Sequence, residues 1–319
     1  MLIFASDSTK HDAEALAIIP ETAIVLRDFF LNVSHKINLG GNMLIQITNH
    51  CTMNCPHCMQ NSTENGHHMS EEVFLKTLEF GEWSEAWLYN ISGGEPTEHP
   101  DFGRFMELLT KHLGDIHFPI PDLPAFTIES NGEWARNVTK TAAVKKVLKS
   151  KRLAGFQVSS FKGLYKNYDF IQKYKKKIEA LHPRMVVVDS GIISMQDLGR
   201  AATSENPSIQ KAISENKYHM PCLNGCLLSK QTEDIRFLSA NLFQHAQNCK
   251  PFVDWKGNVH WSESICCPSY GNVLTDDFET IWKNLREAKP CGKCRLYKKF
   301  LNSTDPKIVH AKMIMGING

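Results

Sequence analysis

Hydrophobic and polar positions alternate in blocks along the middle of the chain. Short apolar runs at 43–49, 87–92, 125–129, 156–160 and 185–193 are typical of buried strands. Between them, apolar positions recur every third or fourth residue and predict helices at 70–80, 101–113, 139–150 and 167–182. Ser70 and Asp101 are candidate N-caps. Regular alternation of strand and helix favours an α/β fold with parallel strands and crossover helices.

The two ends of the chain depart from this pattern. Residues 1–42 form an N-terminal extension, and 206–248 are predicted to be a linker after the α/β part at 43–205. From 249 to 319 the sequence predicts a small domain with a hairpin turning at 256–258 and an amphipathic helix at about 277–285.

Charge and cysteine content narrow the class of protein. The net charge of +2 gives no broad attraction to nucleic acid or to an anionic membrane. The lysine-rich stretch 173–177 is predicted to be the solvated face of a helix. The N-terminus has no basic region before an apolar run, so no signal peptide is expected. Ten cysteines in CxxC-type groups indicate metal ligation in a reducing cytoplasm, not a disulfide scaffold.

Three cysteines follow the first predicted strand, at Cys51, Cys55 and Cys58. Three thiolates on one loop can hold three irons of a cubane cluster and leave the fourth iron open to a small molecule. A zinc knuckle is the alternative, because His50, His57, His67 or His68 could supply a fourth ligand.

A second motif, Gly-Gly-Glu-Pro at 93–96, follows the second predicted strand. Glycine lets the backbone approach a ligand closely, and Glu95 offers an acceptor. Taken alone, the motif is an ordinary turn. Together, the cysteine loop and this turn resemble the radical S-adenosylmethionine family. In that family the open iron chelates the amino and carboxylate groups of S-adenosylmethionine, whose reductive cleavage gives a 5'-deoxyadenosyl radical.

The resemblance implies a partial (β/α) barrel of the radical S-adenosylmethionine type, with the site at the C-terminal ends of the strands. Such barrels commonly have six strands, so a sixth strand here is irregular or absent. No catalytic residue is assigned. The family's cofactor-binding positions correspond to His57 (the ring on adenine), Gly93, Gly94 and Glu95 (methionyl ammonium), Asn131 and Ser160 (ribose or carboxylate) and Arg200 (a carboxylate). For Asn131 and Ser160, a plain turn at a strand end is an equally good interpretation.

The remaining cysteines lie beyond the barrel. Cys249, a hairpin returning to Cys266 and Cys267, a helix, and then Cys291 and Cys294 can hold a four-cysteine cluster or a structural zinc. This order resembles the auxiliary-cluster extensions called SPASM and twitch, which implies one auxiliary [4Fe–4S] cluster. Which of Cys266 and Cys267 is a ligand stays open. Cys222 and Cys226 fit neither cluster, and are a functional pair, alternative ligands or buried small apolar residues.

The resemblance implies an oxidoreductase-type enzyme that abstracts hydrogen from a substrate and takes electrons from a flavodoxin or ferredoxin. A ribosomally made peptide is the favoured substrate. The alternatives are dehydrogenation of a small molecule such as an amino sugar, or a non-catalytic metal-binding module that contacts a protein or RNA.

Overall fold

The computed structural model describes residues 42–84, 86, 88–115, 125–189, 199–215, 251–260, 268–286, 302 and 304. They all belong to one compact unit, Leu39–Gly319. None of the helices in these ranges is long and apolar enough to cross a membrane.

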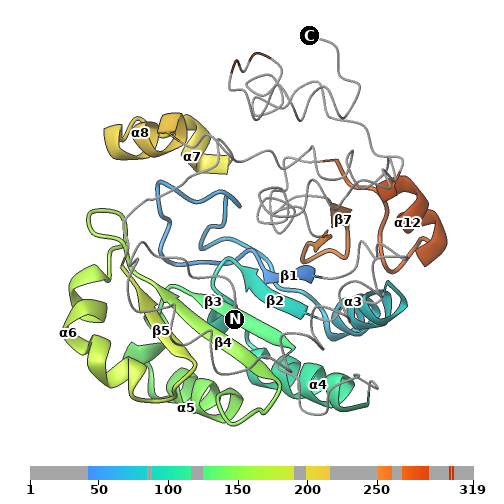
Figure 1. Ribbon diagram of the computed structural model, residues 1–319, viewed down its shortest axis with the longest axis horizontal. Helices are drawn as coiled ribbons and strands as arrows, with labels where there is room; N and C mark the ends of the chain where they lie inside the picture. Colours follow the sequence, from blue (N-terminus) through green and yellow to red (C-terminus); the bar gives the residue numbers. More distant parts are fainter. Residues whose placement is uncertain are drawn as a thin grey trace, which may run out of the picture. The chain divides into compact units, whose positions relative to one another are not determined.

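The described residues form a seven-stranded sheet in the order β5-β4-β3-β2-β1-β6-β7 (Figure 1). The first five strands along the chain pair in parallel with one another, which confirms the predicted α/β fold with a parallel sheet. They are β1 (Asn42–Thr48), β2 (Leu88–Gly93), β3 (Phe126–Ser130), β4 (Leu153–Ser159) and β5 (Met185–Val188). The fourth strand begins earlier than predicted, and part of the predicted fifth strand, 190–193, lies outside the described residues.

Crossover helices connect the parallel strands and lie along one side of the sheet (Figure 1). They are α3 (Glu71–Trp83), α4 (Phe102–Asp115), α5 (Val138–Val147) and α6 (Tyr168–Glu179), close to the predicted ranges. Ser70 is the N-cap of α3, as predicted, because its side chain accepts a hydrogen bond from the Val73 N–H at 3.2 Å. Helix α4 begins directly after Asp101.

Short helices occupy several connections. The two 3₁₀ segments η2 (Pro96–Glu98) and η3 (Glu133–Arg136) follow β2 and β3. After β5 come α7 (Gly199–Thr203) and α8 (Pro207–Glu215). Helix α8 lies inside the predicted linker 206–248, so the first part of that segment is helical; 216–248 lie outside the described residues.

The two faces of the sheet differ in chemistry because side chains alternate along a strand. Toward the helices, the strands contribute buried apolar side chains to one core, among them Ile45, Ile91, Ile128 and Val158. On the other face, Gln46 is in register with Ser92, and Glu129 with Gln157. The Ser92 hydroxyl donates to Glu129 at 3.4 Å and joins the two pairs. We call Gln46, Ser92, Glu129 and Gln157 the polar row.

The described C-terminal elements share the core of the barrel. Strand β6 (Phe252–Val253) pairs in parallel with β1, and β7 (Val259–His260) pairs antiparallel with β6. Helix α12 (Phe278–Arg286) packs on α3, where the rings of Phe278 and Phe80 are 5.3 Å apart. The hairpin and the amphipathic helix are therefore as predicted. The sheet, however, runs across the predicted boundary between barrel and C-terminal domain, and the return strand toward Cys266 and Cys267 lies outside the described residues.

Candidate cluster site

The three cysteines lie on the loop that leaves the C-terminal end of β1, where the sequence places the site. Cys51 and Cys55 are each 9% exposed and Cys58 is half-buried; all three are free thiols. The Cys51 N–H donates to the Thr63 carbonyl at 2.8 Å, and the Cys58 N–H donates to the Cys55 carbonyl at 3.2 Å. Backbone hydrogen bonds thus fold residues 51–63 back on themselves and bring the cysteines onto one loop, which we call the cluster loop.

The surroundings of Cys51 and Cys55 disfavour the ionised thiolate form when no metal is bound. Burial raises the pKa of Cys51 to about 12, and the nearby carboxylates of Glu95 and Glu98 add to this rise. Burial also raises the pKa of Cys55 to about 11, together with the neighbouring Cys58. A metal cation reverses this preference, because a coordinating thiol is deprotonated. Asn131 Nδ2 lies 3.7 Å from Cys51 Sγ and points an N–H toward the sulfur.

Two glycines allow other segments to approach the cluster loop closely. A side chain at Gly94 would place its Cβ 2.0 Å from the His50 carbonyl oxygen. At Gly199, where φ is +55°, a Cβ would lie 2.3 Å from the Met59 carbonyl oxygen. The turn after β2 and the start of α7 therefore pack directly on the loop backbone.

Arg200, the residue after Gly199, also contacts the backbone of the cluster loop. Its backbone N–H donates to the Cys58 carbonyl at 2.9 Å, and its side-chain Nε donates to the Cys55 carbonyl at 3.0 Å. The sequence suggests that Arg200 pairs with a cofactor carboxylate, and this stays a prediction. In the structure the side chain fixes the backbone between two of the cysteines.

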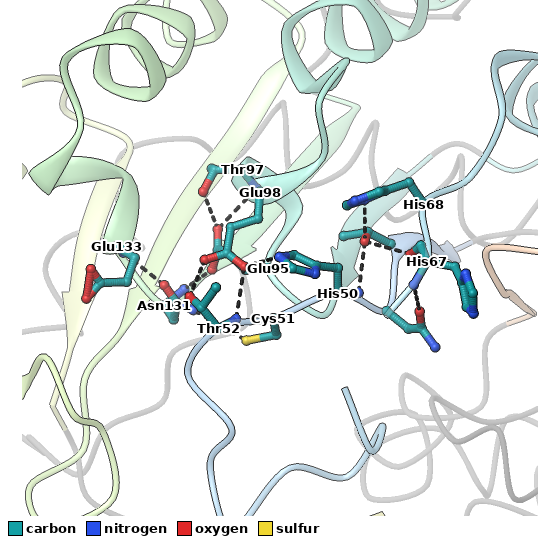
Figure 2. A network of polar contacts seen from close by, with 12 residues as sticks. His50, Cys51, Thr52, His67, His68, Glu95, Thr97, Glu98, Asn131 and Glu133 are labelled. Atoms are coloured by element: carbon teal, nitrogen blue, oxygen red, sulfur yellow. Dashed lines mark hydrogen bonds and ion pairs between the residues drawn. The ribbon is translucent and has the colours of Figure 1, made fainter. Parts of the chain in front are cut away.

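Glu95 lies at the centre of a buried network at the ends of β2 and β3 (Figure 2). Its carboxylate accepts from the Thr97 N–H and hydroxyl, the Ser130 hydroxyl at 2.8 Å and the Asn131 N–H at 2.6 Å. Burial raises the pKa of Glu95, while these hydrogen bonds act in the opposite direction. Three of these donors bind Oε1 and only the Asn131 N–H binds Oε2, so Oε2 can accept one further hydrogen bond. The predicted contact of Glu95 with a methionyl ammonium group stays a prediction.

Glu98 was not singled out by the sequence, yet it contacts the cluster loop (Figure 2). One carboxylate oxygen accepts from the Thr52 N–H at 3.0 Å and the other from the Thr52 hydroxyl at 2.5 Å. His50 Nε2 lies 3.4 Å away, and the Glu98 side chain is only 4% exposed. Nothing in the sequence couples residue 98 to residue 52, because the contact exists only once β1 and β2 are paired.

An aromatic group surrounds His57 beside the cysteines. The ring of His57 lies 5.0 Å from that of Tyr165 and 6.1 Å from that of Phe161. Burial, with the charge of Arg200, lowers the pKa of His57 to about 4, so the ring is neutral near pH 7. Its Nδ1 is buried and has no hydrogen-bond partner among the described residues. A bound ligand could form a hydrogen bond with His57 Nδ1. Tyr165, which packs against Cys51 and Cys55, was missed because ring residues on a connecting segment carry no spacing signal.

Asn131 and Ser160 lie at the ends of β3 and β4, as predicted. The Asn131 side-chain oxygen accepts from the Glu133 N–H at 2.8 Å, so its amide is fixed between Glu133 and Cys51. Ser160 is fully buried, and its hydroxyl accepts from Gln172 Nε2 at 3.3 Å. Their predicted contacts with a cofactor stay predictions.

The residues of the loop fit an iron–sulfur cluster, in which each thiolate binds its own iron. Three free thiols lie on one loop, and Asn131 points an N–H toward the sulfur of Cys51. Across the described ranges, no three His, Cys, Asp or Glu side chains converge to hold a single metal ion. Outside the described residues lie the predicted auxiliary ligands and the unassigned pair: Cys249, Cys266, Cys267, Cys291, Cys294, Cys222 and Cys226.

The fold and the loop together define a parallel α/β partial barrel with a candidate cluster site at the C-terminal ends of its strands. Residues 45–180 match the family model described as the Radical SAM superfamily. This segment runs from β1 into α6 and contains both motifs, and it is similar to that superfamily. The match implies a [4Fe–4S] cluster and S-adenosylmethionine as cofactors. A comparison with curated proteins found no match.

Three similar solved structures are distant relatives in sequence. BtrN in complex with AdoMet and 2-DOIA is 13% identical, with a TM-score of 0.47, and the match covers 87% of each chain. Native anSMEcpe with bound AdoMet and Cp18Cys peptide is 12% identical, with a TM-score of 0.48, over 86% of this chain and 99% of that one. Streptococcus suis SuiB bound to precursor peptide SuiA is 11% identical, with a TM-score of 0.46, over 96% and 82%.

Proposed function

We propose that this protein is a radical S-adenosylmethionine enzyme that abstracts hydrogen from a polar substrate, a ribosomally made peptide. The observation that carries the proposal is the buried three-cysteine loop at the C-terminal end of β1, within a segment that matches the superfamily model. When bound, the cluster and S-adenosylmethionine would supply a 5'-deoxyadenosyl radical after one-electron reduction. A flavodoxin or ferredoxin is the proposed electron donor.

The protein's own residues would hold and orient these groups. Cys51, Cys55 and Cys58 would each bind one iron and leave the fourth iron open. The neutral ring of His57 offers a flat apolar surface with one free nitrogen, which suits the adenine. Gly93 and Gly94 bring the turn after β2 against the Thr48 and His50 carbonyls, just before the cluster loop, where the methionyl group would bind.

The polar row supports a substrate that forms hydrogen bonds. It crosses four adjacent strands on the face opposite the helices. On the same face, Gln46 Oε1 and Asn90 Nδ2 are buried without a partner among the described residues. Carboxamides pair well with amides, since each offers both a donor and an acceptor. A peptide backbone meets this requirement.

A small amine such as an amino sugar is the second candidate. The polar row contains one carboxylate, Glu129, which would suit an ammonium group. Carbon-deuterated peptide and carbon-deuterated amino sugar, given separately to the reduced enzyme, distinguish the two. Deuterium would appear in 5'-deoxyadenosine only with the molecule that donates the hydrogen atom.

We further propose one auxiliary cluster, held by Cys249, Cys291, Cys294 and either Cys266 or Cys267. The intact protein would then bind about eight irons, as two cubanes. Replacing Cys291 and Cys294 by Ala would lower this to about four and stop product formation. Four irons plus one zinc in the intact protein would contradict the auxiliary cluster.

The central experiment is S-adenosylmethionine cleavage by anaerobically reconstituted, dithionite-reduced protein. The wild type should form 5'-deoxyadenosine and the Cys55→Ala variant should form none, because one of three cluster ligands is lost. The Cys291→Ala variant is the matched control, since its thiol lies outside the cluster loop, and it should retain cleavage. A wild type that forms no 5'-deoxyadenosine would favour the non-catalytic metal-binding module.

A further inference from the structure

Glu98 combines three properties that a solvated surface carboxylate lacks. Its side chain is 4% exposed, it accepts two hydrogen bonds from Thr52, and it lies beside His50. Thr52 and His50 flank Cys51 on the chain. One buried carboxylate on η2 therefore holds both neighbours of a predicted cluster ligand.

The contact to Thr52 controls the shape of the cluster loop. The Thr52 backbone N–H and hydroxyl each bind a different oxygen of Glu98, so the residue is held at two points. Hydrogen bonds to a charged acceptor are about twice as strong as neutral ones. These two hydrogen bonds help to fix the path of the backbone at Cys51, shortly after the end of β1.

The same carboxylate places negative charge near the sulfur of Cys51. Both oxygens of Glu98 bind Thr52, the residue directly after Cys51, so the charge lies next to a predicted cluster ligand. A negative charge at this position opposes the addition of an electron to iron bound by Cys51. Coulomb interactions become stronger as burial lowers the local dielectric constant, and the Glu98 side chain is 4% exposed.

We propose that Glu98 is a positioning residue of the cluster loop, and that its carboxylate lowers the reduction potential of a cluster bound by Cys51. The inference rests on the proposed function, because it requires a cluster at this loop. Hydrogen bonding, burial and charge around the sulfurs are known to set cluster potentials. A lower potential makes the reduced cluster a stronger one-electron donor, which cleavage of a sulfonium requires.

The test is a redox titration of the reconstituted protein followed by electron paramagnetic resonance, which detects only clusters that are bound. Glu98→Gln keeps the shape of the side chain and removes its charge, so the midpoint potential should rise. Thr52→Val removes one hydrogen bond and keeps the charge, so the potential should not rise. Glu133→Gln is the matched control, because that carboxylate pairs with Arg136 at 3.4 Å, and its potential should stay at the wild-type value.

Positioning is measured separately by amide hydrogen exchange over residues 50–54 before the cluster is inserted. Exchange should be faster in Glu98→Gln than in the wild type, and unchanged in Glu133→Gln. An unchanged potential in Glu98→Gln, or an equal rise in Thr52→Val, overturns the charge effect; unchanged exchange in Glu98→Gln overturns the positioning role. Wild-type iron content is measured first, so a protein without a cluster refutes the proposed function, whereas a bound cluster with unaltered potential refutes only this inference.

Discussion

The cluster loop follows β1, and the turn of the β6–β7 hairpin follows β6 of the same sheet. The two segments are held by different kinds of contact. Contacts to the loop come from far along the chain, as in the pairs Thr52–Glu98, Cys51–Asn131 and Cys55–Arg200. Contacts within the hairpin are local, since Asp254 accepts from the N–H groups of Lys256 and Asn258, both at 2.9 Å. The loop takes its shape from the assembled sheet. The hairpin turn is held by its own residues and by the segment that follows it, where Asn272 Nδ2 donates to the Lys256 carbonyl at 2.9 Å.

This difference separates two ways of building a functional turn. A locally specified turn tolerates change elsewhere, because the groups that define it are neighbours in sequence. A turn held by distant segments can place donors and charges from three strand ends around one group, but each such segment must be in position. Substitutions in the loop's supports should therefore lower both stability and cluster binding, whereas substitutions in the hairpin should lower stability alone.

The largest effect is expected for Gly94→Ala. The new Cβ would meet the backbone of His50, which cannot move without displacing Cys51, so we expect a loss of about 3 kcal/mol in unfolding free energy. Urea denaturation measures the loss, and iron content should fall with it. Gly114→Ala in α4 is the control, because a Cβ there meets no atom within 4 Å, and it should be neutral or slightly stabilising. Equal losses of stability in Gly94→Ala and Gly114→Ala would contradict the close packing of the turn after β2 on the chain beside the cluster loop.

A matched pair of carboxylates compares the two regions directly. Glu95→Gln and Asp254→Asn each turn one acceptor oxygen into a donor inside a network of donors. For Glu95, which joins segments from two strands, we expect a loss of about 3 kcal/mol and reduced iron binding; for Asp254, about 1.5 kcal/mol and full iron binding. Chemical denaturation and iron analysis provide both readouts. Loss of iron in Asp254→Asn would show that the hairpin also supports the loop.

The contribution of Asp254 should depend on pH. Burial alone would raise the pKa of Asp254, but hydrogen bonds from His260 and Asn258 lower it below the usual value of 3.8. A carboxyl whose pKa is lower in the folded state stabilises the protein above its unfolded pKa and loses that effect as the pH falls through the folded one. The difference in unfolding free energy between wild type and Asp254→Asn should thus shrink below about pH 4. A constant difference would mean that charge has no part in it.

A smaller effect is expected for Gly257→Ala in the hairpin turn. The residue has φ of +87°, and the three atoms nearest to a Cβ there, at 3.0–3.2 Å, belong to side chains, which can shift. The cost is then mostly that of a left-handed backbone, about 1–2 kcal/mol. Thermal denaturation should show this loss with unchanged iron content. A loss as large as that of Gly94→Ala would contradict the local character of the turn.

The smallest effect is expected for Lys256→Ala. The Lys256 ammonium lies 4.9 Å from the centre of the Trp255 ring, at an exposed position, and such a contact contributes about 0.5 kcal/mol. The stacking of Trp255 on His67, at 4.7 Å between ring centres, should persist. Trp fluorescence and denaturation together test this expectation. A change above about 1 kcal/mol would indicate that Lys256 helps to hold the hairpin against the loop after the cysteines.

The difference between local and distant contacts also explains which features could be predicted from the sequence and which could not. The Ser70 cap, the turn at 256–258 and the amphipathic helix are encoded by neighbouring residues, and all three were confirmed. The cysteine spacing indicated the family because its motif is also local. Glu98 and Tyr165 were missed because each acts on the cysteines across strands that are distant in sequence.

The pairing of β6 with β1 was also missed. A two-residue strand, Phe252–Val253, carries too short a pattern to show periodicity, and its partner lies at the other end of the described chain. The hydrogen bonds from Ser130 and Asn131 to the Glu95 carboxylate likewise form only when the ends of β2 and β3 lie side by side. Geometry of this kind depends on which strand ends are brought together, and the motif alone does not contain it.

The β1–β6 pair has a consequence for the order in which the protein is made. On the ribosome, β1 emerges long before β6, so one side of Leu44 and Ile45 waits for Phe252 and Val253 to be synthesised. An unpaired strand with apolar residues is prone to join with other chains, and late, long-range pairing slows folding. Until β6 has docked, the strand that leads into the cluster loop is therefore paired on one side only, by β2. The loop is expected to gain its full support only from the complete sheet.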